Sequence, residues 1–232
     1  MDKLALKVTS STKSKGLRPS NVNSKMAPRT RVVYSKPVEI CHQQVFNKHK
    51  VVERIARNTV IIISSFYRCK HPGAVELFDS YMSSVIASQK ASLLEQQTEL
   101  SKAISQAEAK GFKFDLQGSP AILDVVISNP HVQQVTDLLL CVDKNIDMLA
   151  KLLLIELIDN DVHKEHTQFA LYTIDYIDKS LTLLLQRLNN EFSFKPNKGV
   201  SKSNTQNVDF DKIKAFLKSL HEAQSQRPDS VE

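Results

Sequence analysis

The side chains best suited to chemistry in this chain are histidines that stand beside acids or cysteines. One such group, a possible metal site, consists of Asp159, Asp161, His163, Glu165 and His166. Two histidine ligands carried by one helix are normally four residues apart, with a third ligand nearby. This group lacks that spacing, so we predict a hydrated turn there and no metal site.

Two pairs of cysteine and histidine raise the same question. Cys41 precedes His42, and Cys69 stands two residues before His71. Zinc sites normally pair their ligands more tightly, and the chain contains no CxxC motif. Cys141 lies in an apolar helix stripe, where a thiol is usually buried, and no strand–turn–helix elbow presents a serine. We therefore expect no catalytic residue, no metal, no cofactor and no enzyme activity.

Two pairs of acids within the helices could support acid–base chemistry. Asp143 and Asp147 form one pair, and Asp175 and Asp178 form the other. Because each pair belongs to an amphipathic helix, the simplest prediction is a solvated helix face.

The elements that carry these residues differ strongly in charge. The chain has 31 Lys and Arg, 25 Asp and Glu, and a net charge of +6. Its first 70 residues contain 15 of the basic residues and only three acids, so this part carries about +12 and the remainder about −6. This separation indicates an amino-terminal third that faces a polyanion, most simply nucleic acid.

Composition also favours double-stranded nucleic acid, rather than a nucleotide or a single strand, as the ligand. None of the five glycines has the spacing of a phosphate-binding loop, and the chain lacks tryptophan, so neither nucleotide chemistry nor a stacking platform for single strands is expected. The longest apolar runs are far shorter than the ~20 residues of a membrane span, and we predict an intracellular protein.

Residues 1–28 are predicted to form a disordered basic arm, because they are polar and offer little to bury. A short strand should follow from Arg29 to Ser35, with a period of two, and Pro37 should end it. One face of this strand carries Arg29, Arg31, Val33 and Ser35.

A single strand cannot satisfy its own backbone groups. Pairing with the same strand of a second chain would form a two-stranded ribbon, which fits the major groove of DNA. The alternatives are pairing with residues 112–127 of the same chain, which would leave the arginines merely exposed, or no strand at all.

The rest of the chain is predicted to be helical. A helical zone around residues 45–66 precedes a long helix at about 74–110, with Gly111 as a left-handed cap. In that helix Ile86, Leu93, Leu100 and Ala107 recur every seven residues, as in a weak coiled coil that packs within the chain or against a second copy.

A second group of helices follows an extended region. Ser128, Asn129 and Pro130 form a helix start, and helices at about 130–158 and 162–192 should be antiparallel, since only a short turn joins them. Residues 195–207 are predicted to be a linker, and residues 209–224 an amphipathic helix. The predicted regions are 1–28, 29–110, 111–194, 195–208 and 209–232.

The order of these features resembles the AcaB family of transcriptional activators, which conjugative plasmids and integrative conjugative elements encode. The features that carry the resemblance are the basic arm, the strand from Arg29, the long helix, the segment Asp124–Pro130 and the helical pair with Val142 and Asp143. The resemblance implies a divergent ribbon-helix-helix DNA-binding dimer that activates conjugation genes, located with plasmid and nucleoid DNA in the bacterial cytoplasm. It also implies that Arg29, Arg31 and Val33 face the DNA groove.

We therefore expect a mainly α protein with a ribbon-helix-helix-like region, long helices, an antiparallel helical pair and little β structure. Its expected function is that of a homodimeric, sequence-specific regulator of promoter DNA, with RNA polymerase as a further partner and no membrane. The alternative is a helical adaptor whose basic arm binds nucleic acid without specificity. The expected base-reading residues are Arg29, Arg31, Val33 and Ser35; the expected phosphate contacts are Lys36, Lys48, Lys50, Arg54 and Arg57, and the arm contributes Lys13, Lys15, Arg18 and Lys25.

Overall fold

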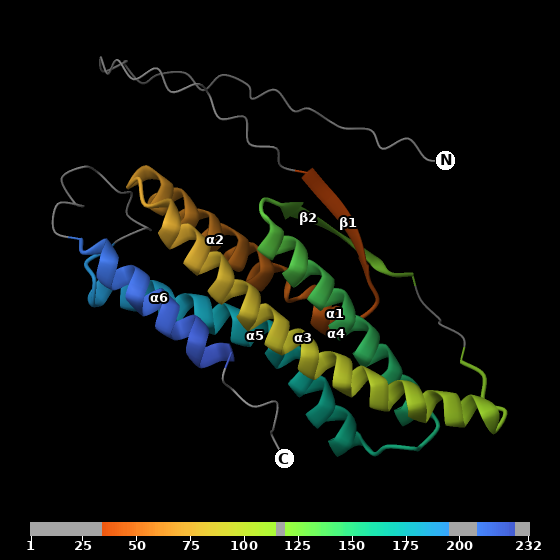
Figure 1. Cartoon of the computed structure of the whole chain (residues 1–232). Helices are drawn as coiled ribbons and strands as arrows, with labels where there is room; N and C mark the ends of the chain where they lie inside the picture. Colours follow the sequence, from red (N-terminus) through yellow and green to blue (C-terminus); the bar gives the residue numbers. More distant parts are fainter. Residues whose placement is uncertain (1–33, 115–118, 195–207, 226–232) are drawn as a thin grey trace, which may run out of the picture. The chain divides into compact units, whose positions relative to one another are not determined.

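The computed structural model describes residues 34–114, 119–194 and 208–225 (Figure 1). Within these residues the structure is mainly α-helical with one small sheet, which confirms the predicted fold class. The predicted arm and nearly all of the predicted linker lie outside the described residues. The elements in chain order are β1 (Tyr34–Ile40), α1 (Gln43–Phe46), α2 (His49–Arg68), α3 (Pro72–Ala109), β2 (Ala121–Ile127), α4 (Pro130–Leu154), α5 (Asn160–Asn190) and α6 (Phe210–Ser225).

The sheet corrects the predicted bounds of the first strand. Strand β1 continues through Pro37 to Ile40 and pairs along its whole length with β2. A proline has no N–H to donate, so Pro37 and its partner Asp124 must form a non-hydrogen-bonded pair. The nitrogen of Pro37 then points to the open side of β1, where a ladder needs no donor.

For β1 the structure shows pairing within the chain. Its antiparallel partner is β2 of the same chain, with Tyr34 opposite Ile127 and Ile40 opposite Ala121. This was the alternative prediction. The physical reason is that β2 supplies both the ladder and an apolar face, because Val38, Ile40, Val125 and Ile127 are all buried on one side of the sheet.

The boundaries of the central helices follow their sequence signals. The asparagine of Ser128-Asn129-Pro130 accepts a hydrogen bond at 3.1 Å from the amide of Val132 and so caps α4. Gly111 has φ +94° just beyond α3, a conformation that favours glycine. Helices α4 and α5 are joined by residues 155–159 and lie side by side in opposite directions (Figure 1), so the predicted antiparallel pair is confirmed.

The heptad residues of α3 pack within the chain. Ile86, Leu93, Leu100 and Ala107 are all buried, and α3 contacts both α4 and α6. Helix α6 docks on α3 through Phe210, Ile213 and Leu217, which are also buried and belong to the same core.

A polar network ties α3 to the antiparallel pair. Asn145 on α4 donates to the side-chain oxygen of Gln96 at 2.9 Å and to the carbonyl of Leu93 at 3.0 Å. Gln96 in turn donates to the carbonyl of His166 on α5 at 3.1 Å. Because these groups are buried, the network specifies how the three helices are aligned. Gln96, a buried polar residue of α3, therefore has hydrogen-bond partners on both other helices.

None of the described helices combines the length and the apolar character needed to cross a bilayer.

Candidate nucleic-acid interface

The solvent-facing side of α2 carries a row of basic residues. The row consists of Lys50, Arg54, Arg57 and Arg68. The last three stand four, seven and eighteen residues after Lys50, close to whole turns of a helix, so all four share one face. Glu53 is the acid beside them. The opposite face packs into the core through Val52, Ile55, Thr59, Ile62 and Phe66. Amphipathic packing thus fixes which way the cations point.

Two of the predicted phosphate-binding residues have carboxylate partners on α5. The ammonium of Lys48 lies 2.8 and 2.7 Å from the two carboxylate oxygens of Asp175. Arg54 binds Asp178 with both arms of its guanidinium, and its Nε donates at 2.8 Å. The side-chain hydrogen bond to Asp178 raises the pKa of Arg54. A DNA phosphate would have to compete with these two carboxylates.

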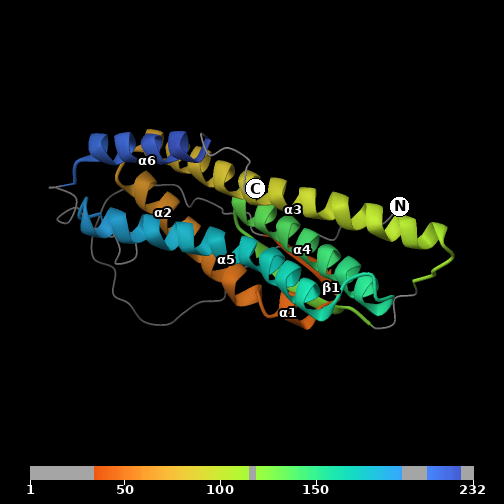
Figure 2. The ribbon, with the colours of Figure 1, turned by 90° about the horizontal axis from the view of Figure 1, so that it is seen from below.

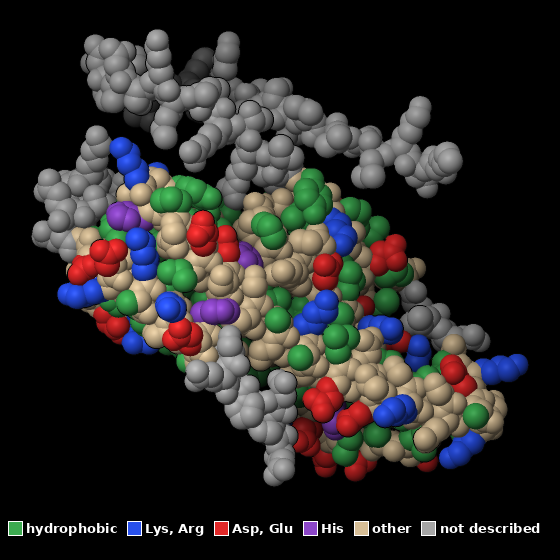
Figure 3. Space-filling model, in the orientation of Figure 1, with side chains coloured by type: hydrophobic (Ala, Val, Ile, Leu, Met, Phe, Trp, Pro, Cys, Tyr) green, Lys and Arg blue, Asp and Glu red, His purple; other side chains and the backbone are tan. Residues whose placement is uncertain are grey.

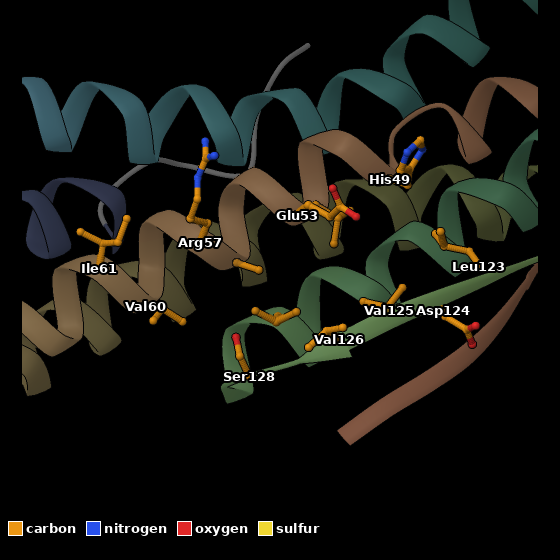
Figure 4. Close-up of a pocket in the computed structure, with 13 residues that line it drawn as sticks. His49, Glu53, Arg57, Val60, Ile61, Leu123, Asp124, Val125, Val126 and Ser128 are labelled. Carbon is orange, nitrogen blue, oxygen red and sulfur yellow. The ribbon is translucent and has the colours of Figure 1, made fainter. Parts of the chain in front are cut away.

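Two more of the five, Lys50 and Arg57, are exposed, and neither forms an ion pair or hydrogen bond with the described residues. Figure 4 shows that Arg57 extends from α2 away from β2, whereas Val60, Val125 and Val126 lie along the hollow between these two elements. This hollow has a volume of about 280 Å³ and mainly aliphatic walls. Lys50, Arg57 and Arg68, which hydrogen-bonds only to Ser64, are therefore the cations of α2 that have no carboxylate partner among the described residues.

The sheet contributes little positive charge beside α2. Lys36, a further predicted phosphate contact, lies 3.3 Å from Asp137 of α4. Ser35 is exposed on the outer face of the sheet, but the same face carries Glu39 and Asp124. The remaining predicted base-reading and arm residues lie outside the described residues: Arg29, Arg31, Val33, Lys13, Lys15, Arg18 and Lys25.

The face formed by α3, α4 and α6 has a different character. Figure 3 shows Lys and Arg side chains interspersed with Asp and Glu over these helices, without a large patch of one sign. Such a surface gives a polyanion no preferred contact. Among the described residues, the basic face of α2 is the best candidate for binding nucleic acid.

Asp143 is buried, which corrects the prediction that it lies on a solvated face. Its carboxylate accepts hydrogen bonds from the amides of Cys41 at 2.9 Å and His42 at 3.0 Å, and it lies 3.1 Å from Nδ1 of His42. Burial alone would raise the pKa of Asp143, but the hydrogen bonds from the His42 ring and these two amides outweigh it and lower the pKa below its ordinary value. Asp143 thus joins α4 to the turn between β1 and α1.

Asp178 is buried as well, contrary to the same prediction. The sequence held a signal for both acids, since residues three or four positions away on the same face are apolar: Leu139 and Ile146 around Asp143, Ile174 and Leu181 around Asp178. An acid on such a face needs a partner, and both acids have one.

The candidate metal ligands serve other contacts. His42 binds Asp143, His71 stacks on Phe210 with ring centroids 3.7 Å apart, and His166 contacts Gln96. Burial lowers the pKa of His71, and nearby Lys214 adds to the effect. In the part of the chain that the structure describes, no three His, Cys, Asp or Glu side chains gather into a group that could hold a metal ion.

Comparison with solved structures shows what this arrangement of helices resembles. The crystal structure of selenomethionine-containing AcaB from uropathogenic E. coli matches with a TM-score of 0.65, over 82% of this chain and 98% of that chain. The chain has an AcaB-like fold. Its sequence identity to AcaB is 14%, so the likeness concerns the fold alone. No protein-family model and no curated protein sequence matches this chain.

Proposed function

We propose that this protein is a sequence-specific regulator of transcription that binds double-stranded DNA. The observation that carries the proposal is the concentration of positive charge in the first 70 residues, which includes the exposed Lys50 and Arg57 of α2. The AcaB-like fold supports it. The family resemblance of the sequence extends it to the activation of conjugative-transfer genes by a homodimer.

The proposed roles of the cations differ. Lys50 and Arg57 bind phosphates and position the protein, and the arm residues add attraction that does not depend on sequence. Arg29 and Arg31 precede β1 directly and read base edges, guanine above all, because two guanidinium N–H groups match the acceptors of that base. Specificity therefore resides in the segment before the sheet.

Replacing both Lys50 and Arg57 by glutamine should weaken binding to all duplexes alike. The slope of log K against log salt should fall by about 0.9 for each phosphate contact that is lost. Fluorescence anisotropy of labelled promoter and random duplexes over a range of salt concentrations measures both effects. The matched control is Lys144→Gln, which removes an exposed lysine from α4. An unchanged slope in the double variant would remove α2 from the interface.

Replacing Arg31 by alanine should have a different signature. We expect a loss of ~1 to 3 kcal/mol for the cognate duplex and a smaller loss for random duplex, so that specificity falls. The cognate duplex is first obtained by selection from a random pool. A wild-type ratio of specific to random affinity near one would instead favour the adaptor function, in which the basic segment binds nucleic acid without reading it.

A further inference from the structure

Helix α5 presents a second exposed surface, separate from the basic face of α2. Phe169, Tyr172 and Leu183 are 43%, 47% and 58% exposed, although large apolar side chains are normally covered. Figure 2 shows α5 at the front of the molecule when seen from below, with no other described helix or strand across it. The opposite side of α5, with Ile174, Ile177 and Leu181, is buried in the core.

These exposed residues form a stripe along α5, in which Tyr176 is only partly exposed and Lys179 lies between Tyr176 and Leu183. Phe169, Tyr172, Tyr176 and Leu183 are separated by steps of three, four and seven residues, the spacing of a helix-pairing seam. The rings of Tyr172 and Tyr176 lie 6.2 Å apart, and the ammonium of Lys179 lies 4.8 Å from the ring of Tyr172. A helix that is apolar on both sides has room for a second packing partner.

The charges at the two ends of the stripe identify that partner. Glu165 and Arg187 are both exposed, and they stand at equal distances in sequence before and after Tyr176. Phe169 and Leu183 are likewise placed symmetrically about Tyr176. At 100° per residue, all four lie within about 40° of Tyr176 around the helix axis. When two such helices pack antiparallel, an acidic side chain therefore faces a basic one and an apolar side chain faces another apolar one.

We propose that a second copy of this chain docks on this surface, with the two α5 helices antiparallel about a two-fold axis at Tyr176. Glu165 of each copy then faces Arg187 of the other, and Phe169 faces Leu183. The contact runs for about 33 Å along the helix, from Glu165 to Arg187. Arg187 also binds Glu191 of its own chain at 2.8 Å and packs on Phe216, but its pair with Glu191 is exposed, and such pairs contribute little.

This interface is formed by α5 and not by β1, and it does not depend on DNA binding. Because Lys48 and Arg54 connect α2 to α5 within each copy, the two-fold axis brings two basic faces into one particle. A particle with this symmetry suits two half-sites related by a dyad.

The test is the mass of the full-length protein by sedimentation equilibrium over a range of concentrations. Wild type should form a dimer. Glu165→Arg alone and Arg187→Glu alone should each raise the dissociation constant about tenfold or more, because each places like charges opposite one another. The double change E165R/R187E should restore the dimer, which a folding defect would not do.

Leu183→Asp should give a monomer that keeps the wild-type circular dichroism spectrum. Lys164→Glu reverses a neighbouring charge that lies off the stripe, so it should leave the dimer intact. A wild-type monomer at all concentrations, or a dimer indifferent to both Glu165→Arg and Leu183→Asp, would overturn the interface. The DNA result is separate, because the Lys50 and Arg57 double variant should remain dimeric.

Discussion

Replacing Asp143 by alanine should lower the free energy of unfolding by about 2 to 4 kcal/mol. The change removes the acceptor of the Cys41 and His42 amides at the start of α1, where no other described group takes these two donors. It also removes the contact with the His42 ring. Urea denaturation followed by circular dichroism measures the loss, since the chain has no tryptophan for fluorescence.

The matched control is Asp147→Ala, one turn further along α4. Asp147 pairs with Lys151 of the same helix, an i,i+4 contact near the surface, so the loss should be about 0.5 kcal/mol or less. Equal losses in the two variants would mean that Asp143 stabilises only its own helix and does not hold the β1–α1 turn.

The effect of Asp143 should depend on pH. Its pKa is lowered in the folded protein, so the folded state binds its proton less readily than the unfolded state does. The stabilisation is therefore complete above the ordinary aspartate pKa of about 4, and it is lost as the pH falls through the lower pKa of the folded protein. The difference between wild type and Asp143→Ala should shrink over that acidic range.

Replacing Arg54 by glutamine should cost about 1 to 3 kcal/mol of stability, because it leaves the buried carboxylate of Asp178 without its guanidinium. Replacing Lys48 by glutamine should cost less, about 1 kcal/mol at most, since Asp175 is more accessible to water. Chemical denaturation of the two variants under identical conditions gives this ranking.

The same variant separates a structural role of Arg54 from a role in DNA binding. If Arg54 stays with Asp178 in the complex, Arg54→Gln should leave the salt dependence of DNA binding near that of wild type. The slope of log K against log salt could instead fall as much for this single change as for each residue of the Lys50 and Arg57 double variant. That result would mean that Arg54 leaves Asp178 and binds a phosphate.

The helices could be predicted from the sequence because their signals are local. Asn129 next to Pro130 marks the start of α4, and Gly111 marks the end of α3, whatever the rest of the chain does. The long-range contacts were harder to predict. The partner of Asp143 lies around residue 42 and that of Asp178 at residue 54, and no spacing rule relates positions so far apart in sequence.

The strand shows the same limit. Alternation from Arg29 to Ser35 indicates extended backbone, but Pro37 argued for an end to the strand. That argument assumes that both edges of the strand are paired, whereas among the described residues β1 has a partner on one side only. The net positive charge of α2 could be predicted from the sequence. Which of its cations bind carboxylates and which face solvent could not, because that depends on how α5 packs beside α2.

The pairing of β1 with β2 also has a consequence for the order of folding. The two strands stand on either side of α1, α2 and α3 in the sequence, so their ladder closes a long loop, whereas the helices and their turns need only neighbouring residues. The sheet should therefore form late, once α4 offers a surface for Val38 and Val125.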